Sequence, residues 1–329
     1  MMLNKKWAII IIFVLFLMLG FIVFRSLQPA INRPSGVETV LPPEPKLPAG
    51  EPLKQPSYAA QGGLLFPNSV PYYSIDSIPS KNQARALVVE LGFSDPYRTV
   101  PSGNATTSYY RNDSATIVTS DTPPIVNFNR QKQPTQLISP GAVPKLQNNA
   151  EALLASLQIY ETPIVLRPTN TQYFSPSQSI TGDPVDPGRA TLVVFNFSYF
   201  LGDYLLFINS VSAPITIGLD AAGSLVSLRI VYPPGITGDT TRKFSVAPYE
   251  RAIERLRGGE GVLLRAETTV GGQELTLPAV PNASSIFKTD LGYFFTYTNP
   301  EVSLVYVFYG NSQSGRVAAK TTTVVSAAP

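Results

Sequence analysis

The residues best placed for covalent chemistry are Ser285 and Lys288, which have the S-x-x-K spacing of the nucleophile motif in penicillin-recognising enzymes. In that motif the serine opens a helix, and S-x-N and K-T-G partners accompany it. Here the pair stands between Pro281 and the strand-like run GYFFTYT, and no such partner follows. In a serine-rich chain about one match of this kind arises by chance, so we expect no catalytic serine.

Two carboxylates, Asp183 and Asp186, lie close together in the loop GDPVDPG. They could contribute to a Ca²⁺ site, but calcium needs several more oxygen ligands. They could also act as acid and base in glycoside hydrolysis, where such carboxylates normally line a cleft. A solvated turn accounts for the loop without either function. The run Gly258–Gly261 lacks the lysine of a phosphate loop and follows a predicted helix, which indicates a helix C-cap.

Aromatic residues gather at 193–207 and 293–309 and offer a possible binding face. The same alternation also fits one core face and one partly covered face of a sheet, and both interpretations stay open. The candidate binding residues are Tyr293, Phe295, Tyr297, Tyr306 and Phe308.

The chain of 329 residues contains no cysteine and no histidine. This composition excludes disulfides, thiol nucleophiles, Ser-His-Asp triads and metal sites built on these residues. We therefore expect no catalytic residue, no cofactor and no metal. Three basic residues near the N-terminus, Lys5, Lys6 and Arg25, account for the net charge of +3. The remainder is neutral, so we expect no nucleic-acid partner.

Residues Trp7–Phe24 are uncharged and almost wholly apolar. As a helix they would extend about 27 Å, which nearly matches the hydrocarbon core of a bilayer. Lys5 and Lys6 before this stretch favour a cytoplasmic N-terminus. A cleaved signal peptide is the alternative, but the apolar stretch is long and no clean cleavage site follows. The sequence thus predicts a single-pass signal anchor in the cell membrane, which contacts the lipid bilayer through residues 7–24 and leaves the C-terminal part outside the cytoplasm.

A large extracytoplasmic region without cysteine is more typical of bacteria than of eukaryotes. Its first part, residues 26–70, is rich in proline and includes LPPEPKLPAGEP. Such a composition favours extended polyproline II and indicates a linker.

Three helices are predicted at 80–91, 143–159 and 248–257 from apolar stripes at helical spacing. Most of the remaining chain alternates like strands. Turn residues at 121–124, 201–203 and 220–223 separate the strands of three predicted hairpins. The run 192–208 is hydrophobic enough for a membrane span, but its polar, β-branched and aromatic residues indicate a buried hairpin.

These elements predict an α+β fold: an N-terminal transmembrane helix, a proline-rich stalk and then modules in which a helix packs on an antiparallel sheet, mostly β. The expected divisions are a cytoplasmic tip and anchor at 1–25 and a linker at 26–70. A first small module would span 71–135 and a second, larger one 136–329.

The order of elements resembles the YycH/YycI type of bacterial membrane-anchored regulators and, more loosely, PepSY-like modules. The resemblance covers about residues 75–325. It rests on the segments NQARALVVELGF, AEALLASLQI, FSYFLGDYLLFINSVSAPITIGLDAAGSLVSLRIVYPP, FSVAPYERAIERLRGGEG and DLGYFFTYTNPEVSLVYVFYG. Understood members bind, restrain or tune other membrane proteins such as sensor kinases, and they have no catalytic residues.

The resemblance implies a membrane-anchored interaction or regulatory protein whose partner is another membrane or envelope protein. Two alternatives from other classes remain: a cell-envelope hydrolase that uses paired carboxylates, and a surface adhesin or pilus-associated component. A cleft with two carboxylates would favour the hydrolase. An exposed aromatic patch or an unpaired edge strand would favour the adhesin.

Overall fold

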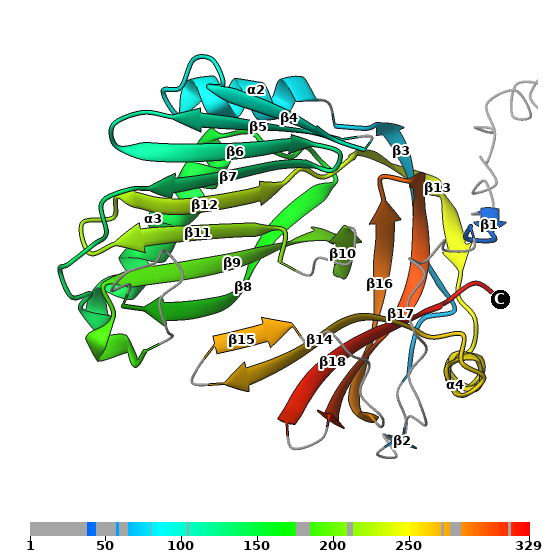
Figure 1. Ribbon diagram of the computed structural model, residues 1–329. Coiled ribbons are helices and arrows are strands. Elements are labelled where there is room, and N and C mark those ends of the chain that lie inside the picture. Colours follow the sequence, from blue (N-terminus) through cyan, green and yellow to red (C-terminus); the bar gives the residue numbers. More distant parts are fainter. Residues whose placement is uncertain are drawn as a thin grey trace, which may run out of the picture. The chain divides into compact units, whose positions relative to one another are not determined.

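The computed structural model describes residues 38–43, 57–58, 65–79, 81–103, 105–175, 185–208, 213–270, 273–276, 284–314 and 317–329. Contacts define two compact units, Met1–Glu38 and Thr39–Pro329, and the fold below is that of the second unit. Its described residues are mainly in strands, with three α-helices and two short 3₁₀ helices (Figure 1).

The strands form one large sheet and one small sheet. The large sheet runs in the order β15-β14-β18-β17-β16-β10-β9-β11-β12-β7-β6-β5-β4, with β2 paired to β16 and β8 paired to β9. The small sheet has the order β1-β13-β3. The strands are β1 (Glu38–Val40), β2 (Ser57–Tyr58), β3 (Ser69–Ser77), β4 (Arg98–Ser102), β5 (Ala105–Arg111), β6 (Ala115–Asp121), β7 (Pro124–Arg130), β8 (Ile164–Phe174), β9 (Leu192–Leu201), β10 (Tyr204–Ile208), β11 (Ile215–Asp220), β12 (Leu225–Val231), β13 (Gly235–Ser245), β14 (Val262–Val270), β15 (Gln273–Thr276), β16 (Ser284–Thr296), β17 (Asn299–Ser314) and β18 (Val317–Ser326).

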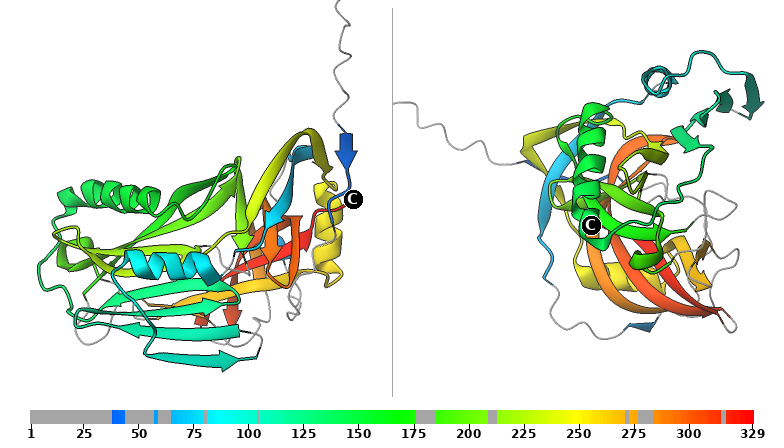
Figure 2. Two further views of the ribbon diagram at one scale, coloured as in Figure 1. Left: turned by 90° about the horizontal axis from the view of Figure 1, so that it is seen from above. Right: turned by 90° about the vertical axis from the view of Figure 1, so that its left-hand side faces the viewer.

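The three predicted helices are confirmed, with small differences at their ends. They are α2 (Lys81–Glu90), α3 (Val143–Ser156) and α4 (Tyr249–Arg257). Helix α2 packs on β6 and β7, α3 packs on β9 and β11, and α4 packs on β18 (Figures 1 and 2). Helix α2 is followed by Gly92, which has a φ of +85°. Glycine adopts this left-handed conformation without a steric cost.

The three hairpins expected from turn residues are also present: β6–β7, β9–β10 and β11–β12. The two halves of the large sheet meet through a parallel pair, β10 and β16, in which Leu205 lies opposite Gly292 and Ile208 opposite Phe295. Strand β7 also pairs with β12. The large sheet therefore includes residues on both sides of position 135, where the first predicted module was expected to end.

Most buried apolar side chains belong to one core, which includes residues from β9, β11, β12, β16 and β17. A second, smaller cluster is formed by side chains that alternate with those of the main core along β10, β16, β17 and β18. Its members are Phe207, Phe294, Val305, Val307 and Val324. Strands β16 and β17 are therefore covered on both faces, which explains their continuous run of apolar residues.

The predicted α+β fold of helix-plus-sheet modules is wrong. The described chain is a mostly β fold, because most strands join into one large sheet and the helices only cover parts of it. Strands β3, β8, β13 and β18 were not predicted. Strand β3 pairs with β13, β8 pairs with β9, and β18 pairs with β17. Local patterns suggested separate helix-and-sheet units because they carry no information on how distant hairpins join.

The predicted membrane topology also needs correction. Among the residues that the structure describes, no helix is long and apolar enough to cross a bilayer. Residues Trp7–Phe24, to which that prediction applied, lie outside the described residues. The predicted single-pass signal anchor, its contact with the bilayer and the localisation derived from it are therefore not supported.

Candidate functional site

A cleft of about 690 Å³ lies beside the small sheet. Four segments line it: β3 with the residues that follow, the start of α2, the loop after α3, and β13 with the two prolines that precede it. The lining side chains include three tyrosines and five prolines: Tyr72, Tyr73, Tyr160, Pro71, Pro79, Pro163, Pro233 and Pro234. The cleft thus joins parts of the chain that are far apart in sequence.

One wall of the cleft is the paired ribbon of β3 and β13. Tyr72 lies opposite Asp239, and Ser74 lies opposite Thr237, so these side chains share a face. The register then shifts between Asp239 and Lys243, and the extra residues form a bulge. From this bulge the Arg242 guanidinium lies 4.1 Å from the centre of the Tyr72 ring, a cation–π contact.

The carboxylates of this ribbon are engaged by neighbouring groups. Thr237 donates a hydrogen bond to Asp76 through its hydroxyl. The Thr241 amide and hydroxyl donate to Asp239 at 2.8 and 2.6 Å. The hydrogen bond from the Thr241 hydroxyl lowers the pKa of Asp239 most, and the bond from the Thr241 amide lowers it further. This carboxylate therefore stays ionised at neutral pH.

The facing wall is the loop after α3, which carries Gln158, Tyr160 and Glu161. Gln158 has a φ of +45°, a left-handed conformation that costs a residue with a Cβ about 1 kcal/mol. These three residues also line an adjoining hollow of about 350 Å³ next to Leu154. Among the described residues, the Glu161 side chain has no hydrogen bond or ion pair, and it is exposed.

Tyrosines beneath the cleft donate hydrogen bonds to the backbone of residues that line it. The Tyr293 hydroxyl donates to the Pro71 carbonyl at 2.7 Å, and its ring meets that of Tyr73 edge to face at 5.2 Å. The Tyr232 hydroxyl donates to the Gln83 carbonyl at 3.3 Å, and Tyr297 donates to the Tyr232 carbonyl. Burial raises the pKa of Tyr232, Tyr293 and Tyr297, so these hydroxyls remain protonated donors.

The five aromatic residues considered as a binding face belong to the core. Tyr293, Phe295, Tyr306 and Phe308 are at most 1% exposed, and Tyr297 is half-buried and packs against the same cluster. The Tyr306 hydroxyl is also used, since it donates to the Ala247 carbonyl at 2.7 Å. These residues therefore support the sheet and do not present an exposed face.

The other motifs are structural where the structure describes them. Ser285 lies within β16 and opens no helix, and Lys288 is 2.5 Å from Asp290. Asp183 lies outside the described residues, whereas Asp186 is exposed and precedes a short 3₁₀ helix. The predicted helix C-cap at Gly258–Gly261 is confirmed, because Gly258 ends α4 and its amide donates to the Glu254 carbonyl at 2.8 Å.

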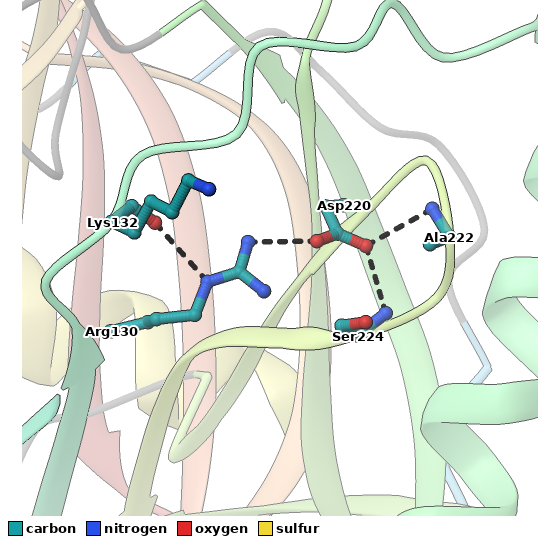
Figure 3. Close-up of polar contacts among 5 residues, drawn as sticks. All are labelled: Arg130, Lys132, Asp220, Ala222 and Ser224. Atoms are coloured by element: carbon teal, nitrogen blue, oxygen red, sulfur yellow. Dashed lines mark hydrogen bonds and ion pairs between the residues drawn. The ribbon is translucent and has the colours of Figure 1, made fainter. Parts of the chain in front are cut away.

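A second polar cluster lies at the β11–β12 turn (Figure 3). Asp220 accepts hydrogen bonds from the Ala222 and Ser224 amides at 3.0 and 2.9 Å. The Arg130 guanidinium lies 2.7 Å from the other carboxylate oxygen and also donates to the Lys132 carbonyl at 3.2 Å. The cluster thus ties the end of β7 to the neighbouring hairpin.

The cleft residues were missed because no local signal marks them. Strands β3 and β13 are separated by about 160 positions, and β13 contains polar residues and a bulge that break its alternation. A weak signal was available in the prolines Pro233 and Pro234 and in the pair Tyr72–Tyr73, which are unusually rigid or bulky side chains next to polar runs.

Comparisons with known proteins define no family for this chain. No family model matches it, and no curated protein matches it. A solved structure, described as an uncharacterized protein from Eubacterium rectale ATCC 33656, is similar over 79% of this chain and 85% of its own, with 10% sequence identity and a TM-score of 0.43. A similarity of this size defines neither a fold nor a function.

Proposed function

We propose that this protein is a binding protein that holds an extended segment of another protein in the cleft between the β3–β13 ribbon and the loop after α3. The observation that carries the proposal is the cleft itself. It is large enough for several residues of a peptide, and its walls combine tyrosine and proline side chains with polar ones. Tyrosine supplies a large contact area at a low cost in conformational entropy, as in many recognition surfaces.

The state of the carboxylates favours binding over hydrolysis. Hydrolysis by two carboxylates needs one of them to be protonated, which requires a raised pKa. In the cleft, hydrogen bonds from Thr241 instead hold the pKa of Asp239 below its ordinary value. Asp76 accepts a hydrogen bond from Thr237. The third carboxylate of the cleft, Glu161, lies exposed on the facing loop. Because both ribbon carboxylates are already hydrogen-bonded within the fold, they are poorly suited to act with it as an acid–base pair.

The resemblance to YycH/YycI regulators supports the same class of function, because understood members of that family act by binding other proteins. One support for the adhesin alternative was an exposed aromatic patch, and four of the five aromatic residues considered for it are buried. We therefore propose that this chain acts by binding another protein.

Photocrosslinking tests this proposal. A photoreactive residue is placed at Thr162 or Thr240, which are exposed positions on the two walls of the cleft. Matched controls carry it at Lys145 or Glu254, which are exposed and lie outside the cleft. The chain is irradiated in extracts of its native cells, and crosslinked segments are mapped by mass spectrometry.

We expect Thr162 and Thr240 to crosslink to the same short segment of one protein, and we expect the two control positions not to do so. Identical products from cleft and control positions would contradict the proposal. So would the absence of any defined product from both cleft positions.

A further inference from the structure

We propose that a second pocket, formed by the first turns of α2, the loop after α2 and strands β5 and β6, binds a neutral saccharide of one or two sugar rings. We call it the α2 pocket. Its volume of about 380 Å³ lies at the lower end of the range for small-molecule sites, about 300 to 1,000 Å³. It shares no lining residue with the cleft, so this inference goes beyond the proposed function and is tested separately.

The inner wall of the α2 pocket is a set of hydroxyl-bearing side chains on one face of the sheet. Thr106, Ser108 and Tyr110 alternate along β5 and therefore share that face. Thr119 of β6 lies opposite Ser108 and also lines the pocket. Tyr110 and Thr119 are only 6% and 8% exposed, so the deepest part of the pocket is hydroxylic.

Two of these hydroxyls have unused bonding capacity. The hydroxyls of Tyr110 and Thr119 make no hydrogen bond to any residue that the structure describes, whereas Ser108 shares one with Thr99 at 3.4 Å. Buried hydroxyls in proteins almost always have a hydrogen-bond partner. Each can both donate and accept, and so can each hydroxyl of a sugar. A polyhydroxylated ligand therefore matches this wall.

The charged groups of the pocket balance one another. Lys81 and Arg85 are exposed and lie one turn apart on α2. Asp95 lies 3.7 Å from Arg85, and Asp121 is the other carboxylate among the lining residues. Two cations thus face two carboxylates, with no excess of either sign. This balance favours a neutral ligand over a phosphate or another anion.

Planar polar groups complete the match to a sugar. One oxygen of Asp121 accepts a hydrogen bond from the Thr106 amide, which orients the carboxylate and leaves its second oxygen open to a ligand. The exposed Asn82 amide offers a donor and an acceptor. A peptide would also need apolar contacts for its side chains, and beside Tyr110 the apolar lining within the described chain is limited to Ala84 and Pro96.

The α2 pocket is suited to binding a sugar and not to cleaving it. Glycoside hydrolysis needs a carboxyl that its surroundings keep protonated, together with a second carboxylate. Asp95 is 84% exposed and lies beside Arg85, and Asp121 is already used by the Thr106 amide. Neither provides the buried carboxyl that hydrolysis requires.

The test is a ligand-observed NMR titration of the full chain. The neutral probes are D-glucose, D-galactose, N-acetyl-D-glucosamine and maltose, and the charged probes are inorganic phosphate and L-glutamate. We expect at least one neutral probe to bind with a Kd of about 1 mM or tighter, and the charged probes not to bind measurably. Failure of all four saccharides, or binding of phosphate or glutamate in their place, would overturn the inference.

Matched variants locate the bound saccharide. Thr119→Val and Tyr110→Phe each remove one hydroxyl with little change in shape, so each should weaken binding about tenfold. The control is Thr107→Val, because Thr107 lies on the opposite face of β5 and outside the pocket. It should leave the affinity unchanged. Equal effects of all three variants, or no effect of the first two, would place the saccharide elsewhere and contradict the inference.

Asp121→Asn separates binding from folding. Asparagine keeps an acceptor for the Thr106 amide but replaces the open oxygen with a donor. We expect a loss of affinity of about tenfold with an unchanged midpoint of urea denaturation. Unchanged affinity would remove Asp121 from the site and with it the case for a sugar. Because the two sites share no lining residue, failure here would leave the crosslinking result for the cleft unaffected.

Discussion

The Arg130–Asp220 cluster and the cleft use similar residues in opposite ways. At the β11–β12 turn, both oxygens of Asp220 are bonded, and the carboxylate side chain is only 15% exposed. In the cleft, Glu161 is exposed and makes no such bond to the described residues. A carboxylate satisfied within the fold contributes to stability, whereas a carboxylate that the fold leaves open is available to a ligand.

The largest expected effect is therefore at the turn. Asp220→Ala removes the partner of Arg130 and two hydrogen bonds to backbone amides, so we expect a loss of about 3 kcal/mol in the free energy of unfolding. Urea denaturation measures it. The control is Asp203→Ala, which breaks the exposed ion pair with Arg167 and should cost under about 1 kcal/mol. Equal losses in the two variants would remove the distinction between the two kinds of carboxylate.

The next largest effect is the pH dependence of stability that comes from the buried tyrosines. It involves neither Asp220 nor Glu161. Burial, with a smaller effect of Asp290, raises the pKa of Tyr309 to about 12, from about 10 in the unfolded chain. Its contribution is fully present below pH 10 and is lost as the pH rises through 12. Unfolding measured across this range should show a decline of about 2 kcal/mol from Tyr309 alone.

Tyr309→Phe provides the control for this pH dependence, because phenylalanine does not titrate. The variant should show a shallower decline above pH 10, while the pH dependence from the other buried tyrosines remains. A decline identical to that of the unaltered chain would contradict the role given to Tyr309.

Gln158 allows stability and binding to be separated within the cleft. Gln158→Gly relieves the left-handed backbone, so we expect a gain of about 1 kcal/mol in the free energy of unfolding. It also removes an amide donor, so peptide affinity should fall. Gln158→Ala retains the unfavourable φ and loses the donor, and should weaken binding without the gain in stability. If glycine stabilised the chain and left affinity unchanged, Gln158 would have no role in the cleft.

The smallest expected effect is that of Glu161→Gln. Because the fold makes no use of this carboxylate, the free energy of unfolding should change by less than about 0.5 kcal/mol. Thermal and urea denaturation both measure it. A loss close to that of Asp220→Ala would mean that Glu161 is a structural residue and is not available to a ligand.

Local sequence patterns predicted much of the secondary structure. The stripe Ala84, Leu87 and Val88 located α2, and the turn residues around Gly223 located the β11–β12 hairpin. Apolar periodicity and turn chemistry depend on residues only a few positions apart, so they can be read without knowing the fold. The same patterns left the aromatic residues ambiguous, because alternation alone does not tell whether a second layer covers a sheet face.

The sequence by itself determined the composition limits, three helices and three hairpins. Only the tertiary structure decided that β10 pairs in parallel with β16, that β3 pairs with β13, and that Tyr293 is buried. The physical reason is distance along the chain. Two remote strands pair when the apolar area buried by the whole sheet outweighs the entropy lost in closing the long loop between them. No short segment of the sequence shows how much area the whole sheet will bury. The cleft arises where those remote pairings meet, and so its residues have no common signature in the sequence.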